Sequence, residues 1–224
     1  MGANMTTFMN IAITCPNCHE EFTGEILTST NTLGGQTTDF RSLAAGFQPE
    51  VAMMQTCPRC GFTAFEEEFK GAISAELSTM IAERITPYAA NEKAEPWRRF
   101  EYAAWIAEWR DRPELEVAHL FLLAGWVCAD ATVHAAASLD DLSEEFYRRQ
   151  AIEHFEKALE KGHVPTVQRA NIAYLIGEQY RRTNDSPAAE AWYDQAIQWV
   201  QDGSRDEGIL DLAEQQKTSP RERL

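Results

Sequence analysis

Apolar residues recur at helical spacing through most of the chain after residue 65. In the first such stretch, apolar residues four positions apart lie on one face of a helix, at Ile73, Leu77, Ile81 and Ile85, before Thr86-Pro87 ends the pattern. Prolines and glycines divide the remainder into further predicted helices. These run from Pro96 to about Arg110, from Pro113, from about Leu142 to Lys161, after Pro165, after the cap-like Ser186-Pro187 and, weakly, after Gly203.

The first 64 residues instead carry short β-prone runs around two pairs of cysteines. Each pair, with its turn, is called a knuckle. Predicted strands lead into and out of both knuckles, at residues 9–14, 21–27, 51–56 and 62–63. This strand–turn–strand plan is typical of a zinc ribbon. The inter-knuckle segment, residues 19–56, has 38 residues, which exceeds the roughly 15–20 of a compact ribbon, so we expect a loop with a tight bend.

The sequence therefore predicts an α+β protein with three parts. Residues 1–64 form a small four-cysteine, zinc-ribbon-like β head, residues 65–214 an all-α tetratricopeptide-like body, and residues 215–224 a frayed polar tail.

The tetratricopeptide interpretation rests on residues 170–203, which span 34 positions, the period of that repeat. In the repeat, small residues let two antiparallel helices approach closely and aromatic side chains fill the gaps beside them. The matching positions are Ile176, Gly177, Tyr180, Ala189, Tyr193 and Ala196, and the preceding helix repeats the second half at Ala151, Phe155 and Ala158. A generic helical bundle is the alternative, because this spacing is also common in bundles.

The cysteine pairs have identical spacing, Cys15-Pro16-Asn17-Cys18 and Cys57-Pro58-Arg59-Cys60. Thiolates three residues apart in a tight turn supply two of the four ligands that zinc takes, so two facing turns complete a closed site. Gly61 suits the positive φ that such a turn favours, and His19 stands at the equivalent position of the first knuckle. We therefore predict one structural zinc ion per chain, bound by Cys15, Cys18, Cys57 and Cys60.

Other uses of these cysteines stay open. CPxC resembles a glutaredoxin-type motif, His19 is a possible substitute ligand, and iron–sulfur or another metal would also accept thiolates. The fifth cysteine, Cys128, lies in an apolar helical run and is expected to be a small buried residue.

The net charge and the absent motifs disfavour several classes of function. Lys and Arg number 20 against 35 Asp and Glu, a formal charge of −15, which disfavours nucleic-acid and anionic-membrane partners. No secretory signal is present, so a reducing cytoplasm is expected. No nucleophile-elbow, P-loop or dinucleotide fingerprint occurs, so no enzyme activity and no catalytic residue are predicted.

An aromatic and basic stretch lies between Trp97 and Arg110. One interpretation is a groove for stacking a peptide or a base, with cationic rims. Packing of a helix with two apolar faces between its neighbours is the interpretation we favour.

The combination of CPNC, Thr38-Asp39-Phe40-Arg41, CPRCGFTAFEEEF, Ala124-Gly125-Trp126 and AIEHFEKALE resembles the bacterial family catalogued as DUF2225, a domain of unknown function, from about Ile13 to Gly162. The resemblance implies a cytoplasmic bacterial protein with a metal-binding head and a tetratricopeptide-like body, and it implies no activity. His19 departs from the family's usual knuckle glycine.

Together these features predict a non-enzymatic zinc-binding adaptor whose helical surface binds a protein partner. The alternatives are a cytosolic thiol redox sensor that releases zinc on oxidation, and an enzyme with its site between head and body. The sequence leaves the partner's identity and the oligomeric state open.

Overall fold

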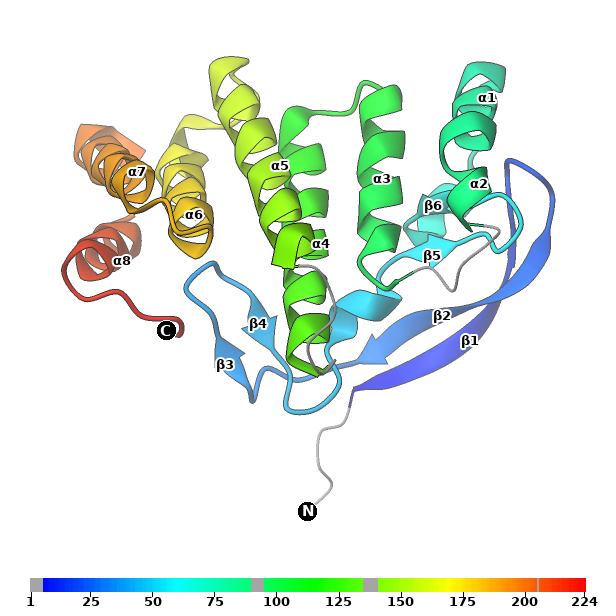
Figure 1. The fold of residues 1–224 in the computed structure, drawn as a ribbon, viewed down its shortest axis with the longest axis horizontal. Helices are drawn as coiled ribbons and strands as arrows, with labels where there is room; N and C mark the ends of the chain where they lie inside the picture. Colours follow the sequence, from blue (N-terminus) through cyan, green and yellow to red (C-terminus); the bar gives the residue numbers. More distant parts are fainter. Residues whose placement is uncertain (1–5, 90–94, 135–140, 205) are drawn as a thin grey trace.

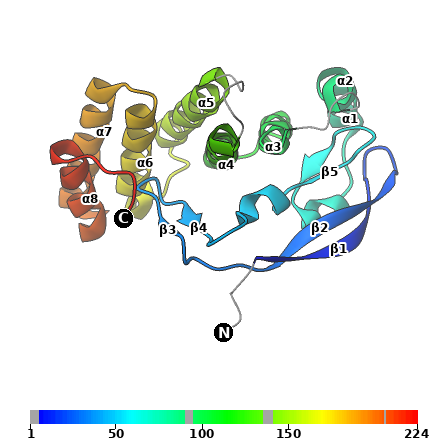
Figure 2. The ribbon, with the colours of Figure 1, turned by 60° about the horizontal axis from the view of Figure 1, so that its bottom comes forward.

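The computed structural model describes residues 6–89, 95–134, 141–204 and 206–224. Helices stand side by side in a row that arches over a layer of strands and loops from the N-terminal part of the chain (Figures 1 and 2). Small antiparallel sheets are followed by a mostly helical remainder, which confirms the predicted α+β class.

Three two-stranded antiparallel sheets occur in the described part of the chain. The longest pairs β1 (Thr7–Thr14) with β2 (Glu21–Ser29) around the first knuckle. The second pairs β5 (Gln55–Thr56) with β6 (Thr63–Ala64) around the second knuckle. The third pairs β3 (Gly35–Gln36) with β4 (Ser42–Leu43) across the bend of the inter-knuckle segment. Each knuckle thus closes an antiparallel hairpin, as predicted.

The predicted strand over residues 51–56 is wrong in its first half. A 3-10 helix, η1 (Pro49–Ala52), occupies that stretch, because Pro49 fixes a helical φ at its start. The side chain of Gln55 then takes the place of a strand backbone beside β2. Its Nε2 donates to the carbonyl oxygen of Glu25 at 2.6 Å, and its Oε1 accepts from the Glu25 amide at 3.2 Å.

Every helix expected from the sequence is present. After η2 (Glu66–Lys70), the elements are α1 (Ala75–Arg84), α2 (Thr86–Ala89), α3 (Arg98–Trp109), α4 (Glu114–His134), α5 (Asp141–Glu160), η3 (Thr166–Gln168), α6 (Arg169–Arg182), α7 (Ser186–Trp199), η4 (Val200–Ser204) and α8 (Glu207–Thr218). None of the described helices is both long and apolar enough to cross a membrane.

Local signals explain several helix ends. The hydroxyl of Ser74 accepts from the amide of Leu77 at 3.1 Å and caps α1. The cap of α7 is Asp185, one residue before the predicted Ser186, and its carboxylate accepts from the Ala188 amide. Gly162 has a φ of 71° just after α5, the left-handed conformation that commonly ends a helix. The residues just before α5, 135–140, lie outside the described part of the chain.

Buried apolar residues form cores that cross residue 64. Met54 belongs to the core of α3, α4, α5 and α6, and Phe62 shares a second core with Ile81 of α1 and Ile106 of α3. The predicted division into a head (1–64) and a body (65–214) is therefore not a packing boundary. Whether the two parts unfold separately stays a prediction.

Small residues set the closest approach of α6 to α7. A Cβ added at Gly177 would lie 2.7 Å from ring carbons of Tyr193, so only glycine fits this contact. At the corresponding place between α4 and α5, a Cβ on Gly125 would lie at an ordinary 3.5 Å from Cγ of Arg148.

The prediction of a frayed tail over residues 215–224 is wrong. Helix α8 continues to Thr218, and the Gln216 side chain is buried and donates to Glu178 of α6 at 2.7 Å. Beyond α8, Arg223 forms a β-bridge with Thr37, and the amide of Leu224 donates to the Gln36 carbonyl at 3.0 Å. Hydrogen bonds to the inter-knuckle segment hold the polar tail where composition alone suggests fraying.

Candidate metal centre

The two knuckles share one backbone geometry. In the first, the Cys15 amide donates to Glu20 and the amide of His19 donates back to the Cys15 carbonyl, at 2.9 and 3.0 Å. In the second, Cys57 and Gly61 make the equivalent bonds, both at 2.9 Å. His19 and Gly61 occupy the same left-handed region, with φ of 61° and 78°. The histidine therefore does not alter the turn.

The four predicted ligands converge. Their Sγ atoms all lie within 4.8 Å of one another. Those of Cys15 and Cys60 are 3.6 Å apart, and those of Cys18 and Cys57 are 3.5 Å apart. A Zn–S distance of about 2.3 Å places tetrahedral sulfurs about 3.8 Å apart, so the cluster has the size of a single site with four thiolate ligands. All four are free thiols.

The thiols constrain one another's charge. Hydrogen bonds from Cys15 and Cys60 lower the pKa of Cys57 to about 2, whereas the bond to Cys57 raises the pKa of Cys15 to about 11. One thiolate is thus stabilised by its neighbours, and a second would face it at close range in a mostly buried site. A divalent cation removes this repulsion, so the donor set suits a metal with an affinity for thiolates.

The second knuckle is packed against the helices. The hydroxyl of Thr86 donates to the Cys60 carbonyl at 2.8 Å. A Cβ added at Gly61 would lie 2.5 Å from Cγ2 of Ile85 and 2.7 Å from Cβ of Ala89. Gly61 is therefore required both by its positive φ and by the close approach of α2, which connects the cysteine cluster directly to the first helices.

A family model described as an uncharacterized protein conserved in bacteria (DUF2225) matches residues 8–219, nearly the whole chain. The chain belongs to this family. No curated protein and no solved structure matches the chain. Family membership brings a bacterial distribution and no established activity.

His19, the possible substitute ligand, does not join the cluster, and neither do Cys128 and His154. His19 is exposed and Cys128 is buried in α4, where burial raises the pKa of its thiol to about 11. His154 is buried, with its Nδ1 2.7 Å from Glu114. Among the residues that the structure describes, the four cysteines are the one group of His, Cys, Asp or Glu placed to share an ion.

The aromatic stretch around α3 divides between core and surface. Trp97, Phe100 and Tyr102 are buried, as the packing interpretation predicts. Trp105 and Trp109 are partly exposed and line a groove of about 550 Å³ between α3 and the α1–α2 pair. The packing interpretation is confirmed for the buried residues, and binding of a peptide or a base in the groove stays a prediction.

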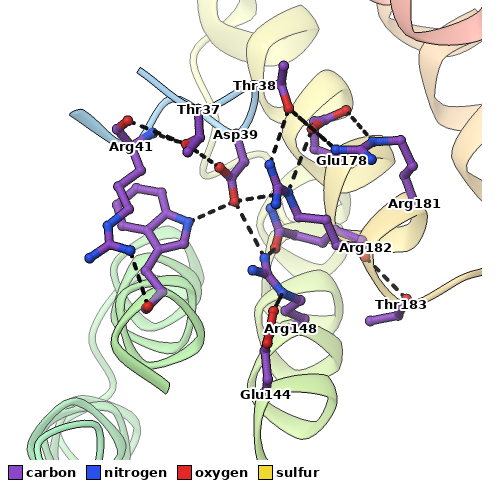
Figure 3. A network of polar contacts seen from close by, with 12 residues as sticks. Thr37, Thr38, Asp39, Arg41, Glu144, Arg148, Glu178, Arg181, Arg182 and Thr183 are labelled. Carbon is purple, nitrogen blue, oxygen red and sulfur yellow. Dashed lines mark hydrogen bonds and ion pairs between the residues drawn. The ribbon is translucent and has the colours of Figure 1, made fainter. Parts of the chain in front are cut away.

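A second constellation, missed by the sequence analysis, lies in the middle of the inter-knuckle segment (Figure 3). One oxygen of Asp39 faces three helices. It accepts from Nε1 of Trp126 in α4 at 2.8 Å, and it lies 3.4 Å from Nη1 of Arg148 in α5 and 3.4 Å from Nε of Arg182 in α6. These three side chains are called the polar clamp. Burial alone would raise the pKa of Asp39, but Arg182 and Arg148 outweigh it and hold the pKa below its usual value.

A fully buried carboxylate adjoins the clamp. Glu178 of α6 accepts from Thr38 and from the Tyr193 hydroxyl, the latter at 2.6 Å, and pairs with Arg181 at 3.0 Å. The sequence does contain one signal for such buried charges. Charged residues stand between apolar residues on the helix faces, as Glu178 does between Ile176 and Tyr180. Nothing in the spacing indicates that their partners lie about 140 residues earlier.

Proposed function

We propose that this DUF2225 protein is a non-enzymatic zinc-binding adaptor, in which a structural zinc ion organises the N-terminal part and the helical row presents a surface to a protein partner. The convergence of four cysteine sulfurs in a largely buried site carries the proposal. Four thiolates fill the coordination of zinc and leave no position for a reactive water, so the ion would act structurally.

The zinc-ribbon-like assignment is supported by the hairpins. Each knuckle closes an antiparallel strand pair, β1–β2 or β5–β6, and both knuckles have the same hydrogen bonds. Tetrahedral coordination by paired turns of this kind is the usual arrangement of structural zinc sites.

The tetratricopeptide-like assignment is supported by successive antiparallel helix pairs, α4–α5 and α6–α7. The predicted small and aromatic positions of their second helices are buried, namely Ala151, Phe155, Ala158, Ala189, Tyr193 and Ala196. Gly177 contacts Tyr193, as the repeat pattern requires. Repeats of this kind commonly offer an extended face to a partner protein. In this proposal the protein acts in the cytoplasm, and its charge of −15 argues against nucleic acid as the partner.

Elemental analysis of protein purified without chelator tests the metal. We expect one zinc ion per chain, unchanged by Cys128→Ser and lost in the Cys57→Ser, Cys60→Ser double variant. The single variant is a matched control, because Cys128 is buried far from the cluster in another core. Iron, or no metal in the unsubstituted protein, would contradict the proposal.

A redox sensor is the second candidate, favoured by the uneven burial of the ligands. Cys18 is the most exposed of the four, and its sulfur lies 3.5 Å from that of Cys57. A peroxide would transfer one oxygen to the Cys18 thiolate, giving a sulfenic acid and hydroxide. The Cys57 thiolate would then displace a second hydroxide to form a disulfide and release the metal. Zinc release together with the loss of two thiols under mild peroxide would support this candidate over a purely structural ion.

A further inference from the structure

The inter-knuckle segment crosses the face of the helical row on which a partner would be expected to bind. The segment passes beneath α6, α5 and α4 between β3 and β4, on the side that the helices arch over (Figures 1 and 2). Its central residues 37–41, called the docked segment, contain the buried Thr38, Asp39 and Arg41.

The docked segment is held mainly through its side chains. Asp39 enters the polar clamp formed by Trp126, Arg148 and Arg182 (Figure 3). The hydroxyl of Thr38 donates to Glu178. A separate peptide with the same side chains could make these contacts, since the helices supply every partner among them.

Phe40 lies at the strained position of the tight turn that the docked segment forms. Its φ is 67°, a region that bulky residues rarely adopt. Its ring packs against Tyr174 of α6, with ring centroids 5.2 Å apart. The conformation is held by the turn itself, in which the Thr37 amide donates to the Arg41 carbonyl and the Phe40 amide donates to the Thr37 carbonyl, and by the bound side chains on both sides.

Arg41 ends the docked segment on α4. Its guanidinium donates to both carboxylate oxygens of Asp130 at 2.9 and 2.6 Å and to Glu50 at 2.6 Å. The recognised pattern is therefore a hydroxyl residue, an aspartate, an aromatic residue and an arginine in succession.

We propose that the face of α4, α5 and α6 carrying the polar clamp is a peptide-binding surface, that residues 37–41 occupy it as an intramolecular ligand, and that the partner supplies a peptide that forms the same tight turn, with a buried aspartate followed by an aromatic residue. This inference rests on the proposed adaptor function and names its partner chemistry. A tethered ligand has an effective concentration on the order of millimolar, so a free peptide with the same contacts competes poorly until the docked segment is released.

The test uses a fluorescent synthetic peptide with the sequence of residues 34–43 and the full-length protein. Asp39→Ala removes the clamped carboxylate from the chain and leaves the clamp free to accept the peptide in trans. We expect saturable binding to this variant that is about ten-fold or more tighter than to the unsubstituted protein. A peptide carrying Asp39→Asn should bind the variant about ten-fold or more weakly, because it lacks the charge that the two arginines meet.

Two controls make the result specific. Asp194→Ala removes an exposed carboxylate from α7 and should behave as the unsubstituted protein does. Asp39→Ala combined with Arg182→Gln should lose the binding that Asp39→Ala gains. Equal binding to the unsubstituted protein and to Asp39→Ala, or no binding to a helical and zinc-loaded Asp39→Ala, would overturn the proposal.

A measurement on the unsubstituted protein covers the case in which Asp39→Ala does not fold. Millimolar isotope-labelled peptide should accelerate amide hydrogen exchange in residues 37–41, while exchange in α7 stays unchanged. No acceleration would overturn the proposal as well. Zinc content is determined on the same samples, so failure of the peptide test with zinc present leaves the metal-binding part of the proposed function standing.

Discussion

The N-terminal part of the chain is attached to the helices at two places that use opposite electrostatics. At the metal centre, four thiols of the same kind converge, and their like charges need an external cation. At the polar clamp, the charge of Asp39 is met by Arg148 and Arg182 from within the chain. In the proposed function the first attachment depends on metal supply, whereas the second is complete in the protein itself.

The two attachments also fix different parts of the row. The metal centre packs on α1, α2 and α3 through Ile81, Ile85 and Ile106, and the clamp engages α4, α5 and α6. Loss of one should leave the other in place, because the cysteine ligands pack in one core, whereas Trp126 of the clamp packs against another. Each of the following variants tests this independence or compares the two sites more closely.

The largest effect is expected at the metal centre. Cys57→Ser combined with Cys60→Ser should unfold the knuckles up to about Phe65, since metal binding supplies about 10–16 kcal/mol in small zinc domains. Most of the helical circular dichroism should survive, because the core of α3, α4, α5 and α6 contains none of the cysteine ligands.

The matched control for this variant is Cys128→Ser, which leaves both knuckles intact. Loss of most of the helical signal in the double variant would show that the metal centre and the helices form one cooperative unit. The packing of Gly61 against Ile85 indicates that α1 and α2 are the helices most exposed to that loss.

The metal centre and the polar clamp also differ in how far their residues could be predicted from the sequence. The ligands Cys15, Cys18, Cys57 and Cys60 lie in two local motifs, so their chemistry and spacing identify the site before any tertiary structure is known. The helices are also local, because their periodicity and end signals lie within about 20 residues. Asp39 and Arg148 are 109 positions apart, and no local rule pairs them. The polar tail was misjudged for the same reason, since its partners Gln36 and Thr37 are distant in sequence.

The second-largest effect is expected at the polar clamp. Asp39→Asn keeps the size of the side chain but removes its charge, which leaves Arg148 and Arg182 without their shared partner. Breaking a buried ion pair typically costs about 3–5 kcal/mol, to be measured by urea unfolding at neutral pH. Asp194→Asn, at an exposed ion pair with Lys217, should cost less than about 1 kcal/mol. Unchanged zinc content in Asp39→Asn would confirm that the two attachments are independent.

The dependence of stability on pH distinguishes the loss of charge in Asp39→Asn from a packing defect. The pKa of Asp39 is lowered in the folded state from its ordinary value of 3.8, so its contribution is present above about pH 4 and is lost as pH falls through the folded-state pKa. The unsubstituted protein should therefore lose more stability below pH 4 than Asp39→Asn does. Parallel pH profiles for the two proteins would contradict the assigned charge of Asp39.

Gly177 tests the helix pairs beyond the clamp. Gly177→Leu places a side chain where a Cβ alone would already lie 2.7 Å from the ring of Tyr193. Overpacking of this kind typically costs about 1–3 kcal/mol and should lower the thermal midpoint. A raised midpoint would mean that α6 and α7 separate freely, because glycine is a poor helix former by about 1 kcal/mol. That outcome would remove the main support for the repeat-like arrangement.

The smallest effect compares the two knuckles with each other. His19 and Gly61 have similar positive φ values, but His19 is exposed, whereas Gly61 faces Ile85 and Ala89. His19→Gly relieves a left-handed conformation worth roughly 1–2 kcal/mol and loses about 0.5–1 kcal/mol through greater freedom of the unfolded chain. The net gain should lie between about 0 and 1.5 kcal/mol, seen as a small rise in the thermal midpoint of the zinc-loaded protein. Gly61→Ala should lower that midpoint by more than this, because it adds both backbone strain and a clash with α2. Similar shifts of the same sign in both variants would show that the second knuckle is packed on the helices less tightly than the contacts of Gly61 with Ile85 and Ala89 require.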